Sequence, residues 1–306
     1  MVQMQQTILN EFRLRVQEQN LNLYGIVIKQ NGERLEHRWR SNDKVNVYSA
    51  SKSVTALAIG ILMDEKKMTL TDRLIDFFPE YQESMANGTE QITIRDLLQM
   101  QSGKFEFFGD FGFKQQDNIA VFMKYPVEAT PGSKFCYSNG CTYLLARIVE
   151  KLSGQTLRDF LVPKLFSVLD IENPQWFTCY HGHTMGASGL FLTTEELSRV
   201  GEVFLNEGRF NETVIVSASF IKACYTDAIL TGDETQLNNS SHYGYQVWLG
   251  EVPGTYRLDG MYGQFSIIFP EENATVTITA HEETKAHEII SAVYQDIFPH
   301  LKTTTP

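Results

Sequence analysis

A serine and a lysine at the start of a long apolar segment could form a nucleophile and its base. Ser49 and Lys52 are three residues apart and precede the apolar run from Val54 to Met63. At this spacing both side chains lie on one face of a helix, and a serine in its first turn lies near backbone N–H groups that stabilise a developing oxyanion. Burial would lower the pKa of Lys52 and let it accept the serine proton. A capping serine and a lysine that reaches solvent would fit the same segment.

The Ser-x-x-Lys spacing is weak evidence alone, because about one such match is expected by chance in a chain of this length. Ser219 and Lys222 repeat it within VSASFIKACY, where a serine fits a helix cap. A second segment favours the first pair, because PGSKFCYSNG contains Tyr137 and Asn139, the only Tyr-x-Asn of the chain. A tyrosine oxygen beside the lysine could relay protons, and the asparagine amide could hold a substrate ester or amide. A loop tyrosine and a capping asparagine are the alternative.

The elements that must position these residues follow from the hydrophobic pattern. LYGIVIKQ (23–30) and ERLEHRW (33–39) are β-rich and flank Asn31-Gly32, a two-residue hairpin turn. Most of the chain from residue 50 to about 230 has a helical pattern. Strand-like runs return in YGYQVWLG, TYRLDG, QFSIIF and ATVTITAH, and HEIISAVYQDIF (287–298) is a closing amphipathic helix.

These patterns predict an α+β protein that forms a single unit over residues 1–306. Residues 1–66 and 230–306 would build one antiparallel sheet with its flanking helices, and residues 67–229 would form a mostly helical subdomain. The first twenty residues fit an amphipathic helix and lack a secretory signal. The longest apolar run is about half the length of a membrane span, so we expect a cytoplasmic protein without a membrane partner.

Composition restricts the partners further. The formal net charge is −11 and no stretch gathers lysines and arginines, which argues against binding of nucleic acid. The four cysteines lack metal-ligand spacing and are expected to be reduced and mostly buried. His181 and His183 have no evident third ligand. We therefore expect no metal site and no cofactor, and the sequence does not indicate an oligomeric state.

Further segments occur in a fixed order with Ser49-x-x-Lys52 and Tyr137-x-Asn139: MTLTDRLIDFFPEY, ITIRDLLQMQSG, PGSKFCYSNGCTYLLARIVEKLSGQTLRDFL and GASGLFLTTEEL. Through these segments and the two motifs, the chain resembles the serine β-lactamases and penicillin-binding proteins. It is most similar to the class C β-lactamase-like serine hydrolases, which include esterases and D-amino-acid peptidases. The resemblance implies a five-stranded antiparallel sheet, an all-helical domain and an active site between them. It implies Ser49 as acylated nucleophile, Lys52 as base, Tyr137 as proton relay and Asn139 as substrate-orienting amide.

The third motif of that family lies on a strand and normally reads Lys or His, then Thr, Ser or Gly, then Gly. The matching stretch here, DGMYGQFSIIF, supplies Met261, Tyr262 and Gly263. Gly263 still permits close approach of a substrate backbone, and the N–H of Gln264 is expected as the second oxyanion donor beside that of Ser49. Met261 cannot supply the cation that helps the family bind a substrate carboxylate.

Two other patterns have both a structural and a functional interpretation. Glu202 and Asn206 resemble a class A β-lactamase motif, but they end the amphipathic helix that begins near Thr194, so helix and turn are the favoured interpretation. A phenylalanine-rich stretch follows a family loop that borders the cleft. A packed core is favoured there, with an apolar wall of the cleft as the alternative. Its phenylalanines are Phe105, Phe107, Phe108, Phe111 and Phe113.

We therefore predict a serine hydrolase that forms an acyl-enzyme on a small ester, amide or short peptide, with an ester favoured. A D-amino-acid peptidase or a β-lactamase is one alternative, which Met261 disfavours unless Arg257 supplies the missing cation. A non-catalytic ligand-binding or assembly module with the same fold is the alternative from another class. The chain has no Gly-x-Ser-x-Gly elbow, which argues against an α/β-hydrolase.

Overall fold

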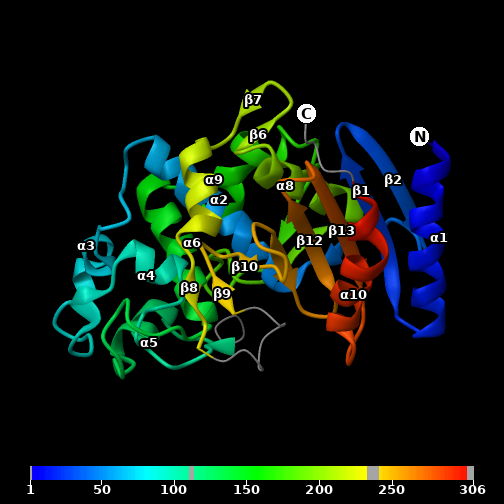
Figure 1. Ribbon diagram of the computed structural model, residues 1–306. Coiled ribbons are helices and arrows are strands. Elements are labelled where there is room, and N and C mark those ends of the chain that lie inside the picture. The colour runs from blue at the N-terminus through cyan, green and yellow to red at the C-terminus, as the bar shows by residue number, and fades with distance from the viewer. Residues whose placement is uncertain (1, 110–113, 233–240, 302–306) are drawn as a thin grey trace.

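The structure of the chain is a computed structural model that describes residues 2–109, 114–232 and 241–301, with side chains from residue 8 onward. It is an α+β fold in which an antiparallel sheet lies beside a largely helical region, and the first and last helices pack at the outer side of the sheet (Figure 1). This architecture agrees with the predicted fold class.

Within the described residues the main sheet has eight antiparallel strands in the order β2-β1-β13-β12-β11-β10-β9-β8. Five longer strands correspond to the five that were expected, and three two-residue strands extend the sheet beyond β11. The strands are β1 (Leu23–Gln30), β2 (Glu33–Arg38), β8 (Ile229–Leu230), β9 (His242–Tyr243), β10 (Trp248–Leu249), β11 (Tyr256–Gly260), β12 (Gln264–Phe269) and β13 (Ala274–Ala280).

One face of the sheet is covered by the two ends of the chain. Helix α1 (Val2–Glu18), helix α10 (Ala286–Ala292) and the following turns η6 (Val293–Ile297) and η7 (Phe298–His300) share a hydrophobic core with the strands. Strand β13 shows the alternation that permits this. Val276 and Ile278 lie in that core, whereas the threonines that alternate with them along the strand face the opposite side.

Helix α8 (Thr194–Leu205) covers the other face of the sheet through small polar side chains. Thr194 and Thr279 share a hydrogen bond of 2.6 Å between their hydroxyls. A Cβ at Gly201 would clash with the hydroxyl of Ser266, so the glycine lets the helix approach the sheet. Helix α8 lies within residues 67–229, the range expected to form the mostly helical subdomain, but it packs against the sheet.

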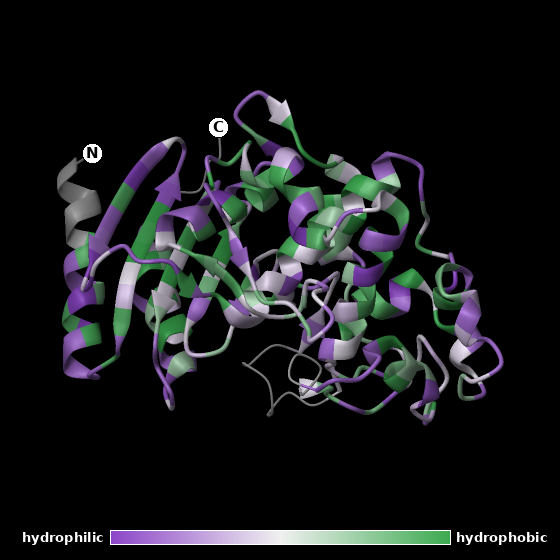
Figure 2. Ribbon diagram, turned by 180° about the vertical axis from the view of Figure 1, so that it is seen from behind, coloured by the Kyte–Doolittle hydropathy of each residue, from purple (hydrophilic) through white to green (hydrophobic). Residues whose placement is uncertain are grey.

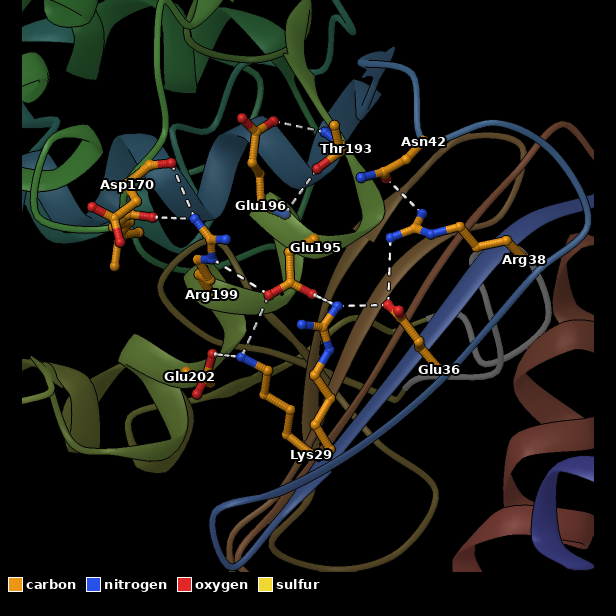
Figure 3. Close-up of polar contacts among 12 residues, drawn as sticks. Lys29, Glu36, Arg38, Asn42, Asp170, Thr193, Glu195, Glu196, Arg199 and Glu202 are labelled. Carbon is orange, nitrogen blue, oxygen red and sulfur yellow. Dashed lines mark hydrogen bonds and ion pairs between the residues drawn. The ribbon is translucent and has the colours of Figure 1, made fainter. Parts of the chain in front are cut away.

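An ion-pair network also joins α8 to β1 and β2 (Figure 3). Glu195 lies 2.5 Å from Arg34, 3.4 Å from Arg199 and 3.8 Å from Lys29. Lys29 also pairs with Glu202 of the same helix. Each partly buried carboxylate is thus matched by cations, which offsets its desolvation where the helix meets the sheet.

The helical region is built around α2 (Ser51–Asp64), in which every residue from Ser51 to Leu62 is buried. From Val54 onward α2 is largely apolar, as expected of a helix that is buried on all sides. Figure 2 shows hydrophobic residues concentrated in the strands and inner helices and hydrophilic residues in the peripheral loops. The other elements are β3 (Val45–Asn46), η1 (Tyr48–Ala50), α3 (Leu74–Phe77), η2 (Pro79–Tyr81), η3 (Thr89–Gln91), α4 (Ile94–Leu98), α5 (Asn118–Lys124), α6 (Asn139–Ser153), α7 (Leu157–Leu161), η5 (Val162–Phe166), β4 (Gln175–Trp176), β5 (Leu190–Leu192), β6 (Arg209–Phe210), β7 (Thr213–Val214) and α9 (Ala218–Thr226).

Two expectations about the chain as a whole can be compared with the structure. Of the four free cysteines, three are buried and Cys136 is partly exposed. Among the helices of the described residues, none has the length and apolar character required to span a bilayer.

Candidate active site

The predicted nucleophile lies in a strained turn at the entrance to helix α2. Ser49 belongs to the 3₁₀ turn η1, so it precedes the α-helix and does not lie in its first turn, as the sequence had suggested. Tyr48 before it has a φ of 46°, in the left-handed region. The side-chain oxygen of Asn46 holds this conformation by accepting the N–H of Tyr48 at 2.8 Å and that of Gly189 at 3.2 Å.

Lys52 is 1% exposed, and uncharged oxygens surround its side-chain nitrogen. Nζ lies 3.1 Å from Ser49 Oγ, 2.7 Å from Asn139 Oδ1 and 2.8 Å from the carbonyl oxygen of Ala187. Burial lowers the pKa of Lys52 to about 7, and no carboxylate of the described residues opposes that effect. A substantial fraction of Lys52 is therefore neutral near pH 7 and able to accept the proton of Ser49.

Tyr137 and Asn139 come to the same point from the start of helix α6. The Nζ atom of Lys52 lies 4.9 Å from the centroid of the Tyr137 ring. Burial raises the pKa of the Tyr137 hydroxyl well above its ordinary value, against the smaller opposing effect of a hydrogen bond with Ser49. Tyr137 therefore stays protonated at neutral pH, where it can relay a proton as a phenol. The four residues of the first two motifs thus lie together.

The third motif lies at a different register from the one expected. A Cβ at Gly260 would clash with the carbonyl oxygen of Val47 and lie 3.2 Å from the amide nitrogen of Ala50, so Gly260 packs directly against the turn that carries the nucleophile. A Cβ at Gly263 would instead meet Ile289 and Ala280, on the side of helix α10. From this packing we infer that the motif glycine is Gly260, three residues before the predicted Gly263.

The residues around this turn have different surroundings from those expected. Gln264 is buried, pairs with Gly260 in the β-ladder, and donates through its side chain to Ala280 O at 2.5 Å. These contacts make it part of the sheet. Tyr262 lies with its ring 5.1 Å from that of Tyr48. Met261 lies at the edge of the cleft and is 55% exposed.

Arg257, the possible substitute for the missing cation of the third motif, is held by other partners. Arg257 is 1% exposed, and its Nε donates to Asp259 at 2.8 Å. Its Nη1 donates to the carbonyl oxygen of Leu249 at 3.3 Å. In the new register the position of the family's lysine or histidine falls on Leu258, which is also apolar. The inference that this motif lacks a cation for a substrate carboxylate is therefore unchanged.

Ser49 opens onto a cleft of about 580 Å³. Among the phenylalanines of the 105–113 stretch, Phe107 lines this cleft, Phe108 is buried in the core and Phe105 lies under Lys134. Phe111 and Phe113 lie outside the described residues. The residues that line the cleft are Asn46, Tyr48, Ser49, Phe107, Gly109, Asn139, Phe177, Thr178, Met185, Ala187, Ser188 and Met261.

The sequence did not single out two residues that shape this site. Ala187 lies in the GASGL segment and supplies the carbonyl oxygen that accepts from Lys52. The two glycines of this segment, Gly186 and Gly189, flank Ala187 and Ser188 and have φ values of 68° and 83°. The Gly186 carbonyl accepts from Thr55 of α2 at 3.0 Å. Glycines on both sides of a short segment were the signal that the backbone itself is used there.

Gln246 joins the helices that carry the site. Its side-chain amide donates to carbonyl groups at the end of α4, and its side-chain oxygen accepts from Thr142 at 2.6 Å. Its backbone carbonyl accepts from Ser53 at 2.6 Å. Ser53 adjoins Lys52 and Thr142 lies one turn after Asn139, so Gln246 sets how α2 and α6 meet. The strand-like pattern around it gave no signal of this role.

The patterns interpreted as structural agree with the fold. Glu202 lies within α8 and pairs with Lys29, as the helix interpretation requires. His183 bonds to Glu150 at 2.9 Å, and the described residues contain no cluster of three or more potential metal ligands of the His, Cys, Asp and Glu types. Ser219 is exposed and donates to Ser217, so it does not repeat the arrangement of Ser49 and Lys52.

Comparison with known proteins assigns the chain to a family. Residues 24–294 match the sequence model described as Beta-lactamase, so the chain belongs to the β-lactamase family of serine hydrolases. A curated relative, the teichoic acid D-alanine hydrolase of Staphylococcus aureus (strain MRSA252), is 22% identical over 270 residues, which cover 83% of this chain and 66% of that protein. The chain thus spans just under two-thirds of the length of that relative.

Solved structures show the same fold. A mutant class C β-lactamase superposes with a TM-score of 0.78 at 13% identity, covering 97% of each chain. EstCE1, described as a hydrolase with promiscuous acyltransferase activity, superposes with a TM-score of 0.77 at 15% identity, covering 95% of this chain and 99% of its own. The resemblance to class C β-lactamases and penicillin-binding proteins that the motifs predicted is confirmed.

Proposed function

We propose that this protein hydrolyses esters through an acyl-enzyme on Ser49. The observation that carries this proposal is the set of three uncharged oxygens around Lys52 Nζ, one of which is Ser49 Oγ at 3.1 Å. A buried amine with such partners loses its proton near pH 7, and a neutral amine at hydrogen-bond distance from a hydroxyl is a general base for acylation.

The other residues then take distinct steps of the reaction. Ser49 Oγ attacks the ester carbonyl while its proton moves to Lys52 Nζ. With Gly260 as the motif glycine, the second oxyanion donor beside the N–H of Ser49 becomes that of Met261, the next residue, in place of Gln264. Tyr137, kept protonated by its raised pKa, passes its proton to the leaving alkoxide and takes up the one that Lys52 accepted, so Lys52 is neutral again. Asn139 fixes Lys52 and the substrate. Water then attacks the acyl-enzyme with the same base, releasing the acid.

An ester without a carboxylate is favoured over a β-lactam or a D-alanine-ended peptide by the third motif. Those substrates bring a carboxylate into the cleft, and an ionised group without a partner costs roughly 1 to 3 kcal/mol or more. Leu258 and Met261 are apolar and Arg257 is paired with Asp259. The names of two similar proteins, a teichoic acid D-alanine hydrolase and EstCE1, a hydrolase, are compatible with this choice.

Labelling with a fluorophosphonate and peptide mapping test the proposal. We expect the adduct on Ser49 and its loss in Ser49→Ala, with Ser219→Ala as the matched control, because Ser219 has the same spacing to a lysine but lies exposed on α9. The unlabelled protein should hydrolyse p-nitrophenyl acetate while turning over little or no nitrocefin, and labelling should abolish the ester hydrolysis. An adduct on another serine would refute the assignment.

A non-catalytic binding module remains the alternative from another class, and the departure from the family's third motif is what favours it. In that case neither labelling nor ester hydrolysis would be detected at any pH, although the protein would remain folded. The labelling experiment therefore separates the two functions without knowledge of the physiological substrate.

A further inference from the structure

Three large apolar side chains that are exposed on the described surface gather at the candidate cleft. Phe107 is 47% exposed, Phe177 is 49% exposed and Met261 is 55% exposed, and all three line the cleft. They come from separate parts of the chain: the loop after α4, the segment after β4 and the turn between β11 and β12. Apolar surface collected from distant segments at the mouth of a cleft is typical of a ligand site.

The two rings are held in place by their own contacts. Phe177 packs edge to face on Phe191, with ring centroids 5.2 Å apart, and its N–H donates to the carbonyl of Gly189 at 2.9 Å. A Cβ at Gly189 would clash with Phe177, so the glycine makes room for the ring. Phe107 stacks on Tyr137 at 6.2 Å. Rings positioned in this way bind a ligand with little further loss of side-chain entropy.

The same cleft offers no counter-charge. Among its described lining residues there is no aspartate, glutamate, lysine, arginine or histidine. Lys52 is buried, and its three hydrogen bonds go to Ser49, Asn139 and Ala187. An ammonium or carboxylate group placed in the cleft would lose hydration without gaining an ionic partner among the described lining residues, whereas an apolar group would gain contacts with the exposed rings.

We propose that the site selects esters that carry an uncharged apolar group, aromatic or a medium-length alkyl chain, and that this group packs on Phe107, Phe177 and Met261. This inference rests on the proposed ester hydrolysis by Ser49 and specifies its substrate class. It excludes an aminoacyl ester with a free ammonium group as a good substrate.

The specificity constant kcat/KM for matched esters tests the proposal. On the acyl side we compare p-nitrophenyl acetate, butyrate and octanoate with the 4-(trimethylammonio)butyrate ester, whose quaternary ammonium cannot cyclise onto the ester. On the alcohol side we compare ethyl acetate with benzyl acetate. Each methylene that becomes buried is worth about fourfold, so at least one side should show a preference of about tenfold or more for the larger apolar group. The 4-(trimethylammonio)butyrate ester should be at least tenfold poorer than the butyrate ester.

Phe177 is the residue to change because it contacts the ring of Phe191 and not Ser49, Lys52 or Tyr137 in the described contacts. Phe177→Ala should lower the preference for the larger apolar group about fivefold, and Phe177→Leu should restore most of it. Val214→Ala and Leu230→Ala remove apolar side chains that are exposed elsewhere, on β7 and β8, and should leave the preference unchanged.

The outcomes separate the inference from the proposed function. If Ser49 is labelled and small esters are hydrolysed, but neither series shows a preference for the larger group, the apolar-group selection is wrong and the hydrolase remains. The same conclusion follows if the kcat/KM of the 4-(trimethylammonio)butyrate ester equals that of the butyrate ester. If Ser49 is not labelled and no ester is hydrolysed, the proposed function itself is overturned, and the substrate class with it.

Discussion

Lys29 and Lys52 both belong to polar clusters inside the protein, but their partners are of opposite kinds. Lys29 lies between the carboxylates of Glu195 and Glu202 on helix α8 (Figure 3). Lys52 contacts a hydroxyl, an amide oxygen and a carbonyl oxygen. Carboxylates favour the charged ammonium, whereas burial among uncharged oxygens disfavours it. The first arrangement attaches a helix to a sheet, and the second is suited to the general base that we propose.

Lys104 shows that a lowered pKa is not sufficient for catalysis. It is fully buried, and its Nζ donates to the hydroxyl of Thr89 at 2.8 Å and to the carbonyl oxygens of Met123 and Tyr125. Burial lowers its pKa to about 8. Thr89, however, is 0% exposed, whereas Ser49 lines a cleft. The hydroxyl beside Lys52 can reach a substrate, and the one beside Lys104 cannot.

The largest effect is expected from removing the base. Lys52→Ala should lower the rate of acylation by an ester about a thousandfold or more, because the proton of Ser49 then has no acceptor. Lys104→Met removes the other buried lysine and, per folded molecule, should change that rate less than threefold. The rates are measured by stopped-flow release of p-nitrophenol. A loss below tenfold in Lys52→Ala would show that another group is the base.

Giving Lys52 a carboxylate neighbour, as Lys29 has, should change the pH dependence. In the unaltered protein the acylation rate should rise with pH through about 7, as Lys52 loses its proton. In Asn139→Asp the carboxylate stabilises the ammonium and raises the pKa of Lys52, so the rise should move to higher pH. At pH 7 the rate should fall roughly 10- to 100-fold and recover partly above pH 9.

Asn139→Ala is the control for this experiment, because it removes the amide without adding charge. It should lower the rate at all pH values and should not move the midpoint upward. A pH profile of Asn139→Asp with its midpoint still near 7 would contradict the assignment of that titration to Lys52.

A lysine at the exposed edge of the cleft should behave in a third way. Met261→Lys places an ammonium group where it keeps its hydration and its charge, so it can pair with a substrate carboxylate. We expect acylation by nitrocefin to rise about tenfold, while hydrolysis of p-nitrophenyl acetate falls by less than tenfold. If the substitution impairs both reactions equally, Met261 is a packing residue of the turn.

The smallest expected effect concerns Lys29. Lys29→Met leaves Glu195 and Glu202 with one cation fewer in a partly buried site, which should lower the free energy of unfolding by about 1 to 2 kcal/mol. Urea denaturation measures it, with Lys151→Met as control, because the Lys151–Glu80 pair is half exposed and should contribute under about 1 kcal/mol. Ester hydrolysis per folded molecule should stay unchanged.

Much of the fold could be predicted because its signals are periodic. The runs 23–30 and 33–39 form β1 and β2, and the last two strand-like runs form β12 and β13. The resemblance implied five strands, whereas the described sheet has eight. YGYQVWLG is strand-like and contains β10, but two-residue strands are too short for their sequence to show that they join the sheet. Helix α8 has an amphipathic pattern, but nothing in that pattern says that its partner is the sheet.

The site was predictable to a similar extent. Serine, lysine, tyrosine and asparagine at fixed spacings identified the first two motifs, and the structure brings them together. We infer that the third motif lies three residues before its predicted place. The sequence alone could not decide between Leu258-Asp-Gly260 and Met261-Tyr-Gly263, because both end in glycine. Only packing shows that Gly260 contacts the turn that carries Ser49, whereas Gly263 faces α10.

The amino-acid sequence by itself determined which groups are available: a hydroxyl and an amine on one helical segment, a phenol and an amide before another, and an apolar residue where relatives carry a cation. Only the tertiary structure decided the protonation state of those groups and whether they can reach a ligand. The pKa of Lys52 depends on its burial and on oxygens from Asn139 and Ala187, which are distant in sequence. Desolvation and the charge of neighbouring groups are properties of three-dimensional surroundings, so spacing along the chain cannot specify them.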